Sequence, residues 1–161
     1  MKLDIRSRSR ALTHMVLLAG FALGLLFLPS RASATLGSDV TSVEADRQQM
    51  RATLALTSNG LYEVHELRTG RGDVVREFVS PEGNVFGVAW KGSVKPQYTQ
   101  LLGSYTNEIT KASELRQNHR APLVIHQPDF VFSSFGHMRF YAGHAYIPSL
   151  LPAGVRPEEI Q

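Results

Sequence analysis

The sequence predicts an α+β protein built on one antiparallel β-sheet. Short segments of alternating apolar residues, separated by turn sequences, recur over residues 52–90 and again over residues 123–147, a pattern typical of antiparallel strands. Residues 96–115 between them carry apolar side chains at helical spacing. We therefore expect an N-terminal helix, a four-stranded meander, a mid-chain helical crossover and two to three C-terminal strands, with the helices on one face of the sheet.

Residues 1–34 have the three parts of a secretory signal peptide. A basic start precedes the uncharged apolar run Met15–Leu28, and Pro29 and the small residues Ala32–Ala34 follow. The apolar run is shorter than the roughly 20 residues that a membrane-spanning helix needs. We expect cleavage after Ala34, export through the general secretory route to the periplasm or the exterior, and a single domain over residues 35–161 without a membrane span.

The charge and composition of the mature chain exclude two classes of function. Removing the leader takes away five of the 17 basic residues and one of the 14 acidic ones, so the net charge changes from +3 to −1. Residues 35–161 contain no basic run and show no nucleic-acid-binding pattern. The chain has no cysteine, which excludes disulfides, thiol chemistry and cysteine-based metal sites.

The N-terminal helix is expected over residues 39–50, because Ser38 or Asp39 can cap it and residues 41–44 have the capping-box spacing. The meander follows, with strands over residues 52–58, 61–67, 74–79 and 85–90. Asn59-Gly60 predicts a type I′ hairpin turn. Turns rich in glycine and proline separate the later strands.

The third and fourth strands can be paired across the turn at residues 80–84. If Val79 lies opposite Val85, the pairs that follow are Phe78–Phe86, Arg76–Val88 and Val74–Trp90. This register gives one bulky, aromatic face and one face with small residues at Gly87 and Ala89, where a helix can approach closely. A slip of one residue would move every side chain to the other face.

The rest of the chain predicts the crossover and the C-terminal strands. Pro96 suits the first turn of a helix over residues 97–102, and a second helical piece is expected over residues 104–115. The expected C-terminal features are strands over residues 123–126 and 129–135, a turn at Gly136-His137, and one bent strand or two over residues 138–147 with Gly143 as a bulge or kink. Residues 150–161 predict an ordered but irregular arm.

Three blocks form a distinctive set: ATLGSDVTSVEADR (residues 34–47), REFVSPEGNVFGVAWKG with the following PQYTQLLGSY (within residues 76–105), and SFGHMRFYAGHAYIPSLLPAGV (residues 134–155). Together they resemble a bacterial family of short exported proteins, domain of unknown function 2844. The resemblance covers nearly the whole mature chain and implies a secreted or periplasmic protein. It implies no activity, and it transfers no catalytic or binding residue.

Three histidines, His126, His137 and His144, are candidates for a zinc site with an open position. His137 and His144 are seven residues apart, an odd spacing that puts them on opposite faces of one continuous strand. Only a bulge at Gly143 or a hairpin would bring them together. A metal-assisted hydrolase is therefore an alternative, beside the interpretation that these are independent strand histidines.

Four residues are candidates for a binding surface. Arg76 and Arg139 are charges within otherwise apolar strands, suited to an anionic ligand or, alternatively, to cross-strand ion pairs on the wet face. Trp90 lies at a strand end, where we expect partial exposure. His137 lies in the C-terminal β segment, where we place any further chemistry.

The sequence thus predicts an exported binding or structural module without catalytic activity and without a cofactor. Its partner would be an unknown envelope protein or ligand, and its oligomeric state is open. Beside the hydrolase, a second alternative is an envelope assembly factor that pairs through an exposed sheet edge. A long unpaired edge strand favours that alternative.

Overall fold

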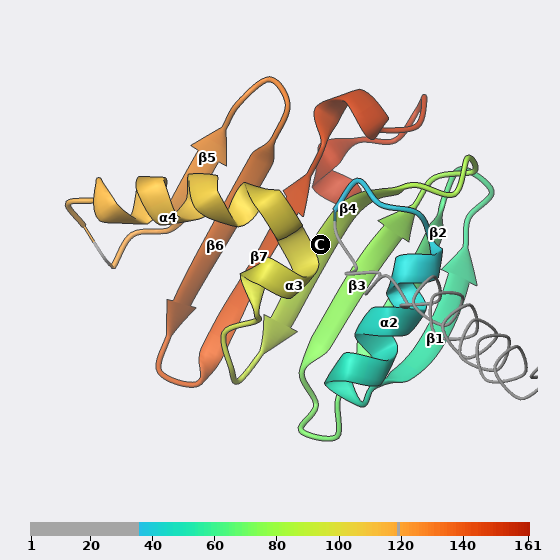
Figure 1. Cartoon of the computed structure of the whole chain (residues 1–161), viewed down its shortest axis with the longest axis horizontal. Coiled ribbons are helices and arrows are strands. Elements are labelled where there is room, and N and C mark those ends of the chain that lie inside the picture. Colours follow the sequence, from blue (N-terminus) through green and yellow to red (C-terminus); the bar gives the residue numbers. More distant parts are fainter. Residues whose placement is uncertain (1–35, 119) are drawn as a thin grey trace, which may run out of the picture. The chain divides into compact units, whose positions relative to one another are not determined.

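The computed structural model describes residues 36–118 and 120–161, which form a seven-stranded antiparallel sheet and a layer of helices (Figure 1). The strands are β1 (Thr53–Ser58), β2 (Glu63–Arg68), β3 (Val74–Val79), β4 (Val85–Gly92), β5 (Leu123–His126), β6 (Val131–His137) and β7 (Phe140–Tyr146). The α+β class expected from the sequence is confirmed. The expected leader, residues 1–34, lies outside the described residues.

The sheet has the strand order β1-β2-β3-β4-β7-β6-β5. Strands β1 to β4 form the expected meander. The crossover consists of α3 (Tyr98–Leu102), a 3-10 turn at Gly103–Tyr105 and α4 (Thr106–Glu114), and it carries the chain to the far edge of the sheet. From there β5, β6 and β7 form a second meander that returns to β4, so the pairing of β4 with β7 joins the two meanders into one sheet.

The helices lie on one face of the sheet, with α2 (Thr41–Met50) over the first meander and α3 and α4 over the second (Figure 1). Asp39 caps α2, because its Oδ1 accepts a hydrogen bond of 2.8 Å from the N–H of Thr41. Within the described residues, no helix is long and apolar enough to cross a membrane. The core between helices and sheet includes Val43, Leu67, Val75, Leu101, Leu102, Ile109, Phe130 and Phe132.

The predicted register of β3 and β4 is wrong beyond its first pair. Val79 pairs with Val85 as expected, but Phe86 is then an extra residue, so Phe78 pairs with Gly87. A β-bulge of this kind shifts every later residue by one position relative to the partner strand. The helix face therefore carries Val75, Glu77, Val88 and Trp90, and the opposite face carries Val74, Arg76, Ala89 and Lys91.

Trp90 is buried under the helix layer rather than partly exposed, with 5% of its surface accessible. Its ring centroid lies 5.5 Å from that of Tyr98 in α3 and 5.7 Å from that of Phe132 in β6. Gly143 lies directly opposite Trp90, and a Cβ atom on Gly143 would overlap the indole ring. Gly143 thus makes room for Trp90 and is not a bulge, and β7 is one regular strand.

The turn at Asn59-Gly60 is wider than the predicted type I′ hairpin, because the loop spans residues 59–62. The Asn59 Oδ1 accepts hydrogen bonds from the backbone N–H groups of Leu61 and Tyr62. Gly60 has a positive φ of 85°, but Asn59 does not. Since a type I′ turn needs a positive φ at both central residues, the Asn59 side chain stabilises a different loop.

The hairpin between β6 and β7 turns later than predicted. The expected turn residues Gly136-His137 belong to β6, where His137 pairs with Phe140. The turn itself is Met138-Arg139, and Arg139 has a left-handed φ of 61°. The two histidines of this region therefore lie on two neighbouring strands, His137 on β6 and His144 on β7.

Residues 150–161 form the irregular arm that the sequence predicted. A 3-10 turn at Pro148–Leu150 leads into the arm, and a second one lies within it at Pro157–Glu159. The arm packs on the sheet face away from the helices, where Ile160 joins a cluster with Phe78 and Phe86. A Cβ atom on Gly87 would lie 3.2 Å from Ile160. Gly87 therefore admits the arm, not a helix as expected, and the arm leaves the rest of this face open.

Two carboxyl groups are buried together between α2 and β3. Asp46 is 1% exposed and Glu77 is 2% exposed, and the Nε2 of Gln100 donates a hydrogen bond of 2.6 Å to the Asp46 Oδ1. Burial and the neighbouring Asp46 raise the pKa of Glu77 well above its ordinary value, and burial also raises the pKa of Asp46. Glu77 thus keeps its proton and shares it in a hydrogen bond with Asp46.

Glu77→Gln is expected to remove a pH dependence of stability. The unfolded chain releases the Glu77 proton near pH 4.5 while the folded chain keeps it, so the unfolding free energy falls as pH rises from 4.5 toward the folded pKa. Glutamine keeps a donor but cannot ionise, so the variant should be more stable than the parent at pH 7.

Urea unfolding of both proteins between pH 4 and pH 8 measures this difference, with Glu114→Gln on the exposed side of α4 as the control. The advantage of Glu77→Gln should shrink toward pH 4. Parallel stability curves for the parent and the variant would contradict a buried, protonated Glu77.

Candidate ligand-binding trough on the open face of the sheet

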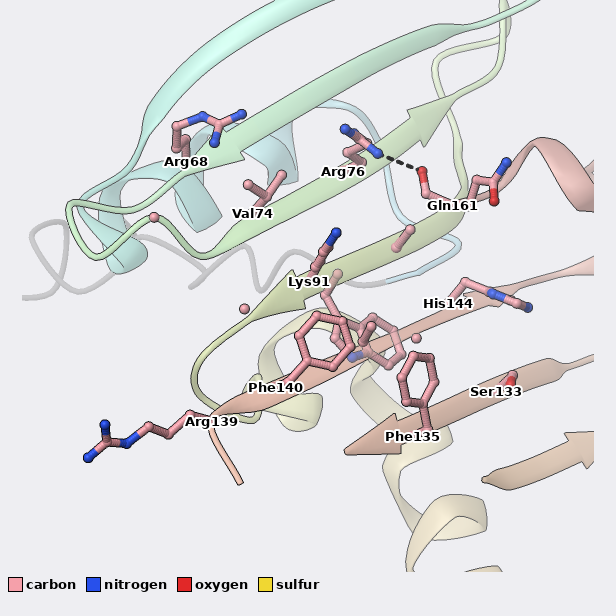
Figure 2. A pocket seen from close by; sticks show the side chains of 16 residues that line it. Arg68, Val74, Arg76, Lys91, Ser133, Phe135, Arg139, Phe140, His144 and Gln161 are labelled. Atoms are coloured by element: carbon pink, nitrogen blue, oxygen red, sulfur yellow. Dashed lines mark hydrogen bonds between the residues drawn. The ribbon is translucent and has the colours of Figure 1, made fainter. Parts of the chain in front are cut away.

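A trough of about 900 Å³ lies on the open face, the sheet face away from the helices, beside the C-terminal arm (Figure 2). Two rows of cross-strand neighbours form it: Arg76, Ala89, His144 and Ser133 in one row, and Val74, Lys91, Ala142 and Phe135 in the next. The middle is hollow because the short Ala89 and Ala142 lie between longer side chains. The lining also includes Arg68, Arg139, Phe140 and Gln161.

Arg68 on β2 and Arg76 on β3 form one wall of the trough, and both donate hydrogen bonds to Glu66. The Nε of Arg76 donates a hydrogen bond of 2.9 Å to Glu66, and an Nη of Arg68 donates one of 2.7 Å to the same carboxylate. The hydrogen bond from Arg76 is the main cause that lowers the pKa of Glu66. The cross-strand ion pair considered from the sequence is thus present, and one carboxylate balances one of the two positive charges.

Arg76 also fastens the C-terminal arm. Its Nη1 donates a hydrogen bond of 2.9 Å to the backbone oxygen of Gln161, as Figure 2 shows. A guanidinium has five N–H donors, so the bonds to Glu66 and Gln161 leave donors of Arg76 for a ligand. Nearly half of the Arg76 side chain is exposed. The arginine therefore forms part of the scaffold and can still contact a bound anion.

Two further cations lie on β4 and on the turn before β7. Within residues 36–118 and 120–161, neither Lys91 nor Arg139 lies within ion-pair distance of a carboxylate. Figure 2 shows Arg139 at the mouth, with its guanidinium pointing outward. Since Glu66 balances only one of the arginines on the opposite wall, the trough carries a net positive charge.

Two phenylalanines give the same end of the trough an apolar surface. The ring centroids of Phe135 and Phe140 are 5.7 Å apart, and Phe135 is 44% exposed. The Lys91 Nζ lies 5.8 Å from the centroid of the Phe140 ring, within the range of a cation–π contact. A cation beside one exposed and one partly buried ring suits a ligand that joins an anionic group to a flat or apolar body.

His144 adds a polar group to the floor of the trough. It lies opposite Ala89 on one side and Ser133 on the other, and its ring stacks on Tyr146 with centroids 6.4 Å apart. Burial lowers the pKa of His144, because desolvation disfavours the imidazolium. The imidazole is therefore neutral at pH 7 and offers one donor and one acceptor to a ligand.

The structure brings together three of the four binding residues that the sequence suggested. Arg76, Arg139 and Trp90 line the trough. Trp90 contributes to the lining only from the far side of the sheet, because its ring is buried on the helix face. His137 lies at the end of β6 beside the ring of Phe140, with centroids 5.9 Å apart, and is not part of the lining.

The three histidines considered for zinc are not brought together. His126, His137 and His144 pair with Val131, Phe140 and Ser133, respectively, and share the open face. His137 is four positions along β6 from the partner of His144, which is roughly 13 Å at about 3.3 Å per residue. In the described part of the chain, no three His, Cys, Asp or Glu side chains are placed to hold a metal ion.

Sequence reasoning missed Lys91, Phe135, Phe140 and His144 as members of one binding surface. The alternation of side chains along β4 could have placed Lys91 on one face of the sheet, since it must face away from its neighbour Trp90. The predicted register, however, put Arg76 on the same face as Trp90. Without the bulge at Phe86, Lys91 could not be placed beside Arg76.

Comparison with known proteins identifies a family but no function. The model of a family described as a protein of unknown function (DUF2844) matches residues 32–160. No curated protein and no solved structure matches the chain.

Proposed function

We propose that the chain, which belongs to the DUF2844 family of proteins of unknown function, is an exported binding module that holds an anionic ligand in the open-face trough. The observation that carries this proposal is the placement of Lys91, a cation without a carboxylate partner among the described residues, over the ring of Phe140, which packs beside the exposed ring of Phe135. Arg139, on the turn before β7, adds a second such cation at the edge of the trough. Charge and apolar surface at one end select ligands that have both an acidic group and a ring or apolar body.

The size and the donors of the trough support a small or chain-like anion. A volume of about 900 Å³ lies within the range of about 300–1,000 Å³ for ligand sites. Lys91, Arg76 and Arg139 offer charged donors, whose hydrogen bonds to a carboxylate or phosphate are stronger than neutral ones. The neutral His144 can accept or donate a further hydrogen bond.

Export is the second part of the proposal and rests on the composition of residues 1–34. A signal peptide would deliver the module to the periplasm or the exterior. The intact mass of the protein recovered outside the cytoplasm is expected to correspond to a chain that begins at Thr35. Retention of the protein in the cytoplasm, or a mass that includes residues 1–34, would contradict this part.

Phenyl phosphate is a suitable probe, because it joins a doubly charged group to one aromatic ring. In a ¹⁵N-labelled sample of the purified protein, we expect it to shift the amide signals of β4, β6 and β7 around Lys91, Phe135 and His144. Benzyl alcohol, which has the ring without the charge, should bind at least about tenfold more weakly, a difference of about 1.4 kcal/mol.

The double variant Lys91→Gln with Arg139→Gln should weaken phenyl phosphate binding about tenfold or more, since a hydrogen bond to a charged group contributes about 1.5–3 kcal/mol. Lys111→Gln on α4, on the opposite face of the sheet, is the matched control and should bind like the parent. Equal binding of benzyl alcohol and phenyl phosphate, or an unchanged double variant, would refute the proposed site.

A further inference from the structure

β1 is an unprotected edge of the sheet. It pairs only with β2 among the described residues, and all six of its residues are exposed. Soluble proteins usually protect such edges with charged residues, prolines or bulges. β1 has none of these: its sequence, TLALTS, is uncharged, and its register with β2 is regular from Thr53 to Ser58.

The apolar side chains of β1 lie on the helix face. Leu54 pairs with the buried Leu67, and Leu56 pairs with His65, so both leucines extend the core side of the sheet to its edge. Their surfaces are nevertheless 42% and 58% exposed. The helix layer therefore does not cover them, and an additional strand would.

The strand has the same sequence in both directions over five positions. Thr53-Leu54-Ala55-Leu56-Thr57 is symmetric about Ala55. An antiparallel pair of such strands places identical or like residues opposite each other when it is centred on Ala55. A two-fold contact between identical chains pairs a surface with itself and must therefore be self-complementary. Here it sets leucine against leucine and threonine against threonine.

We propose that β1 pairs antiparallel with β1 of a second copy of this chain, about a two-fold axis that passes between the two Ala55 residues. Leu54 then lies opposite Leu56 of the second copy, and Thr53 lies opposite Thr57. The four leucines form one apolar cluster on the helix face, and the threonines form cross-strand pairs on the other face. The strand brings no charged residue into the contact.

The pairing has a consequence for the open face. A two-fold axis perpendicular to the sheet keeps the open faces of both copies on the same side. Both troughs then belong to one continuous sheet surface and are available to one long polyanion, whose binding would be strengthened by two linked sites. The dimer itself does not depend on the proposed ligand.

Sedimentation velocity on the purified protein tests the dimer. A single strand pair is a small interface, so we expect a reversible equilibrium whose average mass approaches two chains between about 1 µM and about 1 mM. Leu54→Lys with Leu56→Lys should abolish the dimer by bringing four ammonium groups together. Leu115→Lys, at an 83% exposed position at the end of α4, is the matched control and should associate like the parent.

Cysteine cross-linking tests the register, and it does not require the double lysine variant to fold. The chain has no cysteine of its own. Ala55→Cys places two cysteines opposite each other, at a cross-strand distance that a disulfide can span, and should give a covalent dimer on mild oxidation. Thr53→Cys should not, because Thr53 faces Thr57 of the second copy.

A parent protein that stays monomeric over the whole concentration range would overturn the proposal. A dimer that persists in the double lysine variant, or equal cross-linking of the two cysteine variants, would overturn it as well.

Discussion

The extra residue Phe86 in β4 determines which side chains of the two central strands face the helices. Before the bulge, Val79 and Val85 are paired as the turn dictates; beyond it, every residue of β4 is moved by one position against β3. Trp90 and Glu77 are thereby buried under α2 and α3, and Arg76 and Lys91 are brought to the open face. The core and the candidate site depend on the same offset.

The one-residue offset leads to different packing on the two faces of the sheet. On the helix face, Trp90 fills the space above Gly143, and the Asp46–Glu77 pair is tolerated because one proton and Gln100 satisfy the buried carboxyl groups. On the opposite face, the extra aromatic ring of Phe86 and the small Gly87 receive Ile160 of the arm. The arm reaches as far as Arg76, and the trough begins there.

Much of the fold was predictable because its determinants are local. Strand alternation and turn residues located the strands to within a few residues, although residues 138–147 were left open as one strand or two. The crossover, the arm and the family resemblance followed from short patterns. The bulge at Phe86 was not predictable from the two strands alone, because the contacts that fit the resulting faces come from distant residues: Ile160 packs against Gly87, and Gly143 leaves room for Trp90. The site was missed for the same reason: Arg76 and Arg139 were recognised as unusual, but only the correct register places them with Lys91, Phe135 and His144.

The core and the trough both depend on which side chains of β3 and β4 share a face, and contacts between backbone protons of the two strands reveal this pairing. In a nuclear Overhauser spectrum of the labelled protein, we predict cross-strand contacts between Glu77 and Val88 and between Arg76 and Ala89. Contacts between Arg76 and Val88 and between Val74 and Trp90 would instead establish the pairing without a bulge. That result would put Arg76 on the same face as Trp90 and separate it from Lys91 and the trough.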